Sequence, residues 1–98
     1  MSKFGITEEQ YTWIKKILST YLPSATIYVF GSRARGDYKK YSDLDLAIEL
    51  TEPIQMKTWS ELQEQFSECF IPYKIDLVDM SKIDPDFRKT IQDELLAF

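Results

Sequence analysis

The chain contains 98 residues, of which 44% are hydrophobic and 14% aromatic, and this composition predicts one compact domain spanning residues 1–98. Its net charge of −4 disfavours a protein that binds extended nucleic acid through the phosphate backbone. The absence of histidine excludes Ser-His-Asp and Cys-His catalysis and histidine-ligated zinc sites, so carboxylates, hydroxyls, lysines and arginines remain as candidates for chemistry.

The first element predicted in chain order is a helix that begins after Thr7. The sequence Thr7-Glu8-Glu9-Gln10 has the form of a capping box. Apolar residues then recur at helical spacing until Pro23, which marks the end of the helix. Thr26–Phe30 follows and consists of β-branched and aromatic residues, which predicts a central strand buried on both faces.

The next stretch combines a turn with a strand that begins in carboxylates. Gly31–Gly36 is a glycine-serine turn with two arginines and can begin a short helix. Asp43–Leu50 then alternates polar and apolar residues. Because alternate side chains of a strand share a face, Asp43 and Asp45 stand side by side while the leucines and the isoleucine point into the core. Two carboxylates that face a turn rich in backbone N–H groups suit the binding of divalent metal ions and a nucleoside triphosphate.

Three more elements complete the predicted fold. Gln55–Cys69 has the apolar spacing of a helix, and Lys74–Asp79 predicts a third strand. Asp84-Pro85 places an N-cap and a first-turn proline before a last helix. The order αβ(α)βαβα predicts an α/β (α+β) fold, a small mixed β-sheet with helices packed on one face. The inward residues of the last helix are Phe87, Ile91 and Leu95.

The third predicted strand carries a further carboxylate. Asp76 lies on the opposite face from Ile75 and Leu77. If this strand pairs beside the second strand, Asp76 joins Asp43 and Asp45 on the uncovered face of the sheet. Three carboxylates on one patch repel each other strongly unless cations intervene, so the cluster argues for a metal site.

The segment from Arg33 to Lys40 holds four basic residues against one acid, which suggests a small anionic ligand rather than a polynucleotide. Arg33 and Arg35 are the candidates for phosphate contact, whereas Lys39 and Lys40 are more simply a solvated loop. A Walker A site is excluded because Gly31–Gly36 is not followed by Lys-Ser/Thr. An EF-hand is excluded because its acid spacing and terminal Glu are missing.

The cellular environment can also be predicted. Cys69 is the single cysteine and cannot form an internal disulfide, which fits the reducing cytoplasm. No apolar run approaches the ~20 residues that a membrane span requires. We therefore expect a cytoplasmic protein with no membrane partner.

The combination of turn and acids resembles the minimal nucleotidyltransferase domain of the DNA polymerase β-like superfamily. The matching features are the turn Gly31-Ser32, ten intervening residues, the pair Asp43 and Asp45, and a third acid, Asp76, on a later strand. Each feature is common alone, but their spacing on strand, turn and strand is specific. The turn and acid segments are most similar to those of small bacterial and archaeal members.

The resemblance implies that this chain transfers a nucleoside monophosphate, most simply AMP from ATP, to a hydroxyl on a second molecule. Gly31 would bring the backbone close to phosphate, and Ser32 would offer its hydroxyl and N–H to the phosphates. Arg33 and Arg35 would balance charge on the leaving pyrophosphate.

The same resemblance gives roles to the carboxylates. Asp43, Asp45 and Asp76 would be the catalytic residues and would bind two Mg²⁺ ions. Asp76 would also help to deprotonate the incoming hydroxyl.

The acceptor is expected on a partner, because larger relatives bind it with a separate domain for which 98 residues leave no room. The family suggests a helical partner protein, either a HEPN-type toxin that this chain would silence as the antitoxin by adenylylating a tyrosine, or a substrate-binding subunit that holds a small molecule. A different class also remains open: a binding module that neutralises its partner sterically and has a vestigial nucleotide site. Neutralisation by an Asp43→Ala protein would favour the binding module.

Overall fold

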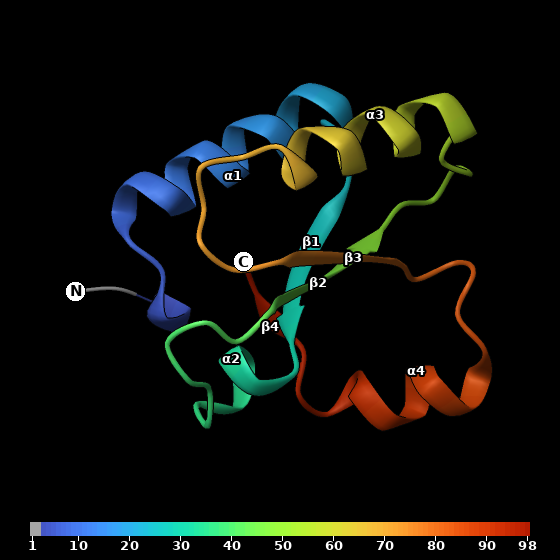
Figure 1. Ribbon diagram of the computed structural model, residues 1–98. Coiled ribbons are helices and arrows are strands. Elements are labelled where there is room, and N and C mark those ends of the chain that lie inside the picture. The colour runs from blue at the N-terminus through green and yellow to red at the C-terminus, as the bar shows by residue number, and fades with distance from the viewer. Residues whose placement is uncertain (1–2) are drawn as a thin grey trace.

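The central sheet is built from four short strands (Figure 1). β1 (Thr26–Phe30) pairs antiparallel with β2 (Leu44–Glu49), and β2 pairs in parallel with β3 (Ile75–Asp79). These three strands confirm the predicted ones to within one residue at each end. The computed structural model describes residues 3–98, so Met1 and Ser2 of the predicted domain lie outside the described residues.

The first helix forms as its capping signal predicts. A short 3₁₀ turn, η1 (Lys3–Gly5), precedes α1 (Glu8–Tyr21). The Gln10 N–H donates to Thr7 Oγ1 and the Thr7 N–H donates to Gln10 Oε1, both at 3.0 Å, so the capping box is complete. No helix within residues 3–98 has the length and apolarity needed to cross a membrane.

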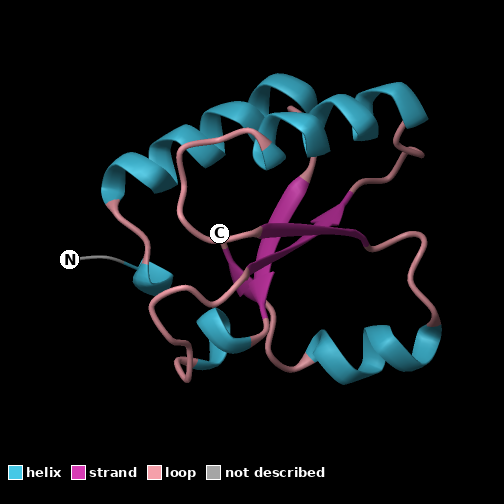
Figure 2. Cartoon of the chain, in the orientation of Figure 1, coloured by secondary structure: helices cyan, strands magenta, loops and turns pink. Residues whose placement is uncertain are grey.

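One face of the sheet is closed by α1 and α3 (Met56–Ser67), which lie across it (Figure 2). The alternation predicted for β2 accounts for this face, since every second residue of the strand points to these helices. The resulting core consists of buried apolar side chains. Its most buried members from these elements are Ile14, Leu18, Leu44, Leu46, Ile48 and Leu62.

The last predicted helix is present, but it covers the opposite face of the sheet, where no helix was expected. α4 (Pro85–Gln92) lies on the far side of the sheet from α1 and α3 (Figure 1). Phe30 and Ala47 point to this side and pack with Met80 and Ile91 in a second apolar cluster. The mixed sheet with its helices is therefore confirmed, but the packing of all helices on one face is wrong.

The end of the chain differs from prediction as well. The last helix ends at Gln92, short of the predicted Leu95, and a fourth strand follows, β4 (Leu96–Ala97). It pairs antiparallel with Tyr28 and Val29 of β1, which gives the sheet order β3–β2–β1–β4. A two-residue strand is too short to show a periodicity, so the sequence carried no signal for it. Its pairing brings the C-terminal segment back beside the turn that follows β1.

Candidate active site

The turn after β1 has a conformation that requires glycine. Gly31 has φ 76° and ψ −158°, and a Cβ added there would collide with Asp45 Oδ2. The short helix α2 (Ser32–Arg35) starts directly after it, with the Ala34 and Arg35 N–H groups donating to the Gly31 carbonyl. The predicted glycine-serine turn therefore exists, and its backbone lies against one of the predicted carboxylates.

The predicted carboxylates lie on the face of the sheet that α4 leaves partly open. Asp45 is paired with Phe30 of β1 on one side and with Asp76 of β3 on the other. Asp43 lies one residue before β2 and is exposed, as is Asp76. Strand alternation thus places Asp43, Asp45 and Asp76 on the same face. Within residues 3–98, however, they do not converge into a ready-made cluster of three metal ligands.

The electrostatics of Asp45 reflect this crowding. Its pKa is raised from 3.8 to about 6, first because the carboxyl is partly buried and then because the charges of Asp76, Asp43 and Glu94 oppose its ionisation. Arg35 acts in the opposite direction but does not compensate. A cation placed among these carboxylates would relieve both the burial cost and the repulsion.

A cleft of about 490 Å³ opens in front of the turn and beside these carboxylates. α4 forms one wall of it through Phe87, Thr90 and Ile91. Asp76 stands outside this cleft, on the strand next to Asp45. The polar residues that line the cleft include Gly31, Ser32, Arg35, Asp43, Asp45 and Glu94.

Arg35 lies at the cleft, as predicted for a residue that meets phosphate. Its guanidinium is exposed and contacts Asp37 Oδ2 at 3.4 Å and Glu94 Oε2 at 3.3 Å. Such exposed ion pairs contribute little to stability. The guanidinium can therefore exchange these partners for an anionic ligand at small cost.

Arg33 is placed elsewhere, and its predicted phosphate contact is not compatible with that placement. The side chain is 2% exposed and donates to the carbonyls of Phe4, Gly5, Lys40 and Ser42 at 3.0 to 3.3 Å. A buried guanidinium that donates four of its five N–H groups to these carbonyls cannot also reach a ligand in the cleft. Arg33 instead anchors η1 and the loop that leads to Asp43.

Two tyrosines hold the Arg33 guanidinium from its faces. Its Cζ lies 4.2 Å from the ring centroid of Tyr73 and 5.1 Å from that of Tyr38. Burial raises the pKa of Tyr73 to about 12, and its hydroxyl donates to Gln10 Oε1 at 2.9 Å. These contacts join α1, α2 and the loop before β2 into one support for the turn and the carboxylates.

The residue that sequence reasoning missed is Glu94. Its Oε1 accepts a hydrogen bond from the Gly31 N–H at 2.8 Å, across 63 positions of the chain. Nothing in the sequence around Glu94 indicates a hydrogen bond to Gly31. Its place depends on β4 pairing with β1, which was also not predicted.

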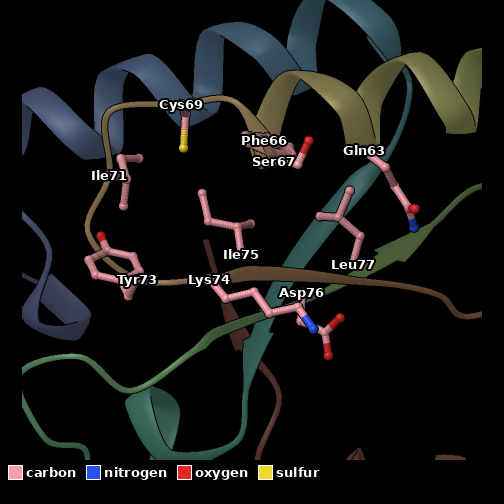
Figure 3. Close-up of a pocket in the computed structure, with 10 residues that line it drawn as sticks. All are labelled: Gln63, Phe66, Ser67, Cys69, Ile71, Tyr73, Lys74, Ile75, Asp76 and Leu77. Atoms are coloured by element: carbon pink, nitrogen blue, oxygen red, sulfur yellow. The ribbon is translucent and has the colours of Figure 1, made fainter.

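A second hollow of about 450 Å³ lies between α3 and β3. Figure 3 shows that Ile75 and Leu77 point into it, whereas Asp76 points away to the other side of the strand. β3 therefore lies between this hollow and the cleft that Asp43 and Asp45 line. The cleft in front of Gly31 is the candidate active site, because it unites the turn, two of the predicted acids and a guanidinium.

Comparison with known proteins identifies the family to which the chain is similar. The family model described as polymerase beta, nucleotidyltransferase matches residues 12–96. A Haemophilus influenzae protein named "Probable protein adenylyltransferase MntA" is 41% identical over 91 residues, which cover 93% of this chain and 80% of the relative. A Thermococcus cleftensis protein named "Protein adenylyltransferase MntA" is 33% identical over 70 residues, covering 71% of this chain and 70% of the relative.

Solved structures with a similar fold are more distant in sequence. A chain from a crystal structure described as a toxin–antitoxin with AMP-PNP aligns with a TM-score of 0.72 at 23% identity, covering 88% of this chain and 69% of its own length. A chain from a mutant toxin–antitoxin MntA-HpeT structure aligns with a TM-score of 0.71 at 22% identity, covering 95% of this chain and 72% of its own length. At these identities the likeness establishes the fold.

Proposed function

This chain belongs to the polymerase beta nucleotidyltransferase family, and we propose that it transfers AMP from ATP to a hydroxyl on a partner protein. The observation that carries the proposal is the contact between the Gly31 turn and Asp45, with Asp43 and Asp76 on the same face of the sheet. This contact puts donors for phosphate directly beside acceptors for cations. The names of the relatives as protein adenylyltransferases support AMP as the group transferred and a protein as the acceptor.

The donor set fits a divalent cation. Asp43, Asp45 and Asp76 offer only oxygen ligands, the kind that Mg²⁺ prefers. Partial burial and the negative charge of its neighbours raise the pKa of Asp45, and a bound cation would offset both. These three residues would hold two Mg²⁺ ions. When bound, such ions neutralise the charge of a triphosphate and favour in-line attack on its α-phosphorus.

The residues around the cleft would bind and orient the nucleotide. The N–H of Gly31 and the N–H and hydroxyl of Ser32 would donate to phosphate oxygens. Arg35 would exchange Asp37 and Glu94 for the leaving pyrophosphate, whose negative charge grows as the bond to the α-phosphorus breaks.

The acceptor hydroxyl would approach from the side of β3. Asp76 is exposed there and has no hydrogen-bond partner among the contacts described for residues 3–98, so its carboxylate is free to accept the hydroxyl proton. Proton transfer to Asp76 would leave an alkoxide or phenoxide as the attacking nucleophile.

The partner we infer is a HEPN-type toxin, with this chain as its antitoxin and a tyrosine hydroxyl as the acceptor. Two chains of similar fold come from structures described as toxin–antitoxin complexes, which supports a partner of this kind. A helical substrate-binding subunit with a small-molecule acceptor would use the same cleft.

The proposal is tested by label transfer from α-labelled ATP to the product of the adjacent open reading frame. We expect a labelled partner with wild-type protein and Mg²⁺. Asp43→Ala and Asp45→Asn should each lower the rate by about 10³-fold or more, because several kcal/mol of charge stabilisation in the transition state would be lost. Glu61→Gln, an exposed acid on α3, is the matched control and should transfer label at the wild-type rate.

Two results would contradict the proposal. Absence of label on the partner with every nucleoside triphosphate would argue against nucleotidyl transfer to protein. Full neutralisation of the partner by Asp45→Asn would identify a binding module, and mass spectrometry of a labelled small product would identify a small-molecule acceptor.

A further inference from the structure

The carboxylate of Glu94 occupies the position that the proposed function assigns to phosphate. Glu94 Oε1 accepts from the Gly31 N–H at 2.8 Å, and Arg35 Nη1 lies 3.4 Å from Oε1 and 3.3 Å from Oε2. Both donors are ones that a triphosphate or pyrophosphate would need. A carboxylate and a phosphate present the same chemistry to them, a negatively charged oxygen acceptor.

Glu94 shares the cleft with two other carboxylates. The side chain is only 24% exposed and lines the same cleft as Asp43 and Asp45. Its charge opposes the ionisation of Asp45, so the two carboxylates repel each other. The contact with Gly31 and Arg35 therefore persists against repulsion, and an anion with more oxygens can replace it.

The surrounding chain allows Glu94 to withdraw. Glu94 follows the end of α4 at Gln92 and is tied by its N–H to the Ile91 carbonyl at 3.0 Å. Beyond it, β4 contributes two residues to the sheet. Phe98 follows β4 and is buried in the main core, so we expect the side chain of Glu94 to turn away while the backbone around it stays paired.

We propose that Glu94 is an internal competitor of the nucleotide, holding the Gly31 N–H and Arg35 in the free protein and leaving them when phosphate binds. This inference rests on the proposed function and adds a competition for the phosphate site that the reaction itself does not require. Binding of phosphate is then coupled to withdrawal of the Glu94 side chain. The affinity for nucleotide is reduced by the fraction of molecules in which Glu94 is docked.

The test is a calorimetric titration with inorganic pyrophosphate in metal-free buffer, repeated with ATP and Mg²⁺. Glu94→Gln removes the charge but keeps an acceptor, and Glu94→Ala removes both. We expect each variant to bind pyrophosphate about 5-fold tighter or more than wild type, a coupling typical of competing contacts. Asp93→Asn, the exposed neighbouring acid, is the matched control and should bind as wild type does.

A positioning role for Glu94 predicts the opposite result. If the contact shapes the turn for phosphate, Glu94→Ala binds more weakly and Glu94→Gln binds equally, and either finding overturns the competitor. Wild-type binding of pyrophosphate and ATP with no gain in the variants also overturns it, while the proposed function stands.

The contact itself has a readout that needs no nucleotide. The Gly31 amide proton should resonate downfield in wild-type protein and move upfield in Glu94→Ala, because its acceptor is lost. An unchanged Gly31 resonance overturns the inference. If no protein in the series, wild type included, binds pyrophosphate or ATP with Mg²⁺, the proposed function fails and the competitor fails with it.

Discussion

The two faces of the sheet are built from alternate residues of the same strands, yet they differ in almost every physical respect. The face under α1 and α3 is closed, and Leu44 and Leu46 are completely buried there. The other face alternates with it and carries Asp45 and Asp76 beside a cleft that α4 covers only in part. The first face contributes hydrophobic stabilisation. The second gathers like charges that cost stability and that the proposed function assigns to metal binding. One strand thus supplies both through its pleat.

The largest effect is expected from the closed face. Leu62→Ala, on α3, should lower the free energy of unfolding by about 3 kcal/mol, because the side chain is fully buried and its loss leaves a cavity. Urea denaturation measures this, with the exposed neighbour Glu61→Ala as control, expected within about 0.5 kcal/mol of wild type. A loss below about 1 kcal/mol for Leu62→Ala would contradict the view that this face holds the core.

The next effect concerns Arg33, which anchors the loop leading to Asp43. We call the face of the sheet with Asp43, Asp45 and Asp76 the charged face. Arg33→Met should lower the free energy of unfolding by about 2 kcal/mol, because four carbonyl oxygens lose their common donor. Arg33→Lys should recover little of it, since an ammonium cannot reproduce the fork of the guanidinium. The measurement is thermal or urea unfolding.

Arg35→Met is the control for that experiment, because it has the same chemistry two residues along. Its ion pairs are exposed, so stability should stay within about 0.5 kcal/mol of wild type while label transfer falls. Equal destabilisation by Arg33→Met and Arg35→Met would show that the buried Arg33 contributes no more to stability than the exposed Arg35.

This contrast also shows where sequence reasoning succeeds and where it stops. The alternation in β2 and β3 was enough to place Asp45 and Asp76 on one face, because a strand has only two sides. The sequence could not show that Arg33 is buried and Arg35 exposed, since a four-residue helix is too short for a hydrophobic pattern. The burial of Arg33 depends on η1, Tyr38 and Tyr73.

Long-range contacts account for the other differences. α4 covers the charged face because Phe30 and Ala47 are apolar there, and the sequence had predicted Thr26–Phe30 to be buried on both faces without indicating what would cover the second. Glu94 reaches Gly31 only because the two residues of β4 pair with β1. Neither contact has a signature within a window of neighbouring residues.

A smaller effect of opposite sign is expected on the charged face. In Mg²⁺-free buffer at pH 7, Asp45→Asn should raise the free energy of unfolding by about 1 kcal/mol, because it removes a partly buried charge that Asp76, Asp43 and Glu94 oppose. Urea denaturation measures the change, with the exposed Asp37→Asn as a control that should be neutral. Destabilisation by Asp45→Asn would show that the carboxylate is stabilised in the free protein.

The smallest effect is the pH dependence of the stabilisation by Asp45→Asn. Asp45 has a pKa of about 6 in the folded protein and near 3.8 when unfolded, so between these values the folded state binds the extra proton. The stability of the wild-type protein should therefore fall as pH rises from about 4 to about 6, and this loss stays at its full extent above that window. The gap between Asp45→Asn and wild type, measured by urea denaturation, should grow over the same range and reach about 1 kcal/mol. If the difference in the free energy of unfolding between Asp45→Asn and wild type does not change with pH, the stabilisation does not come from removing the charge of Asp45. The two faces of the sheet would then differ in packing alone.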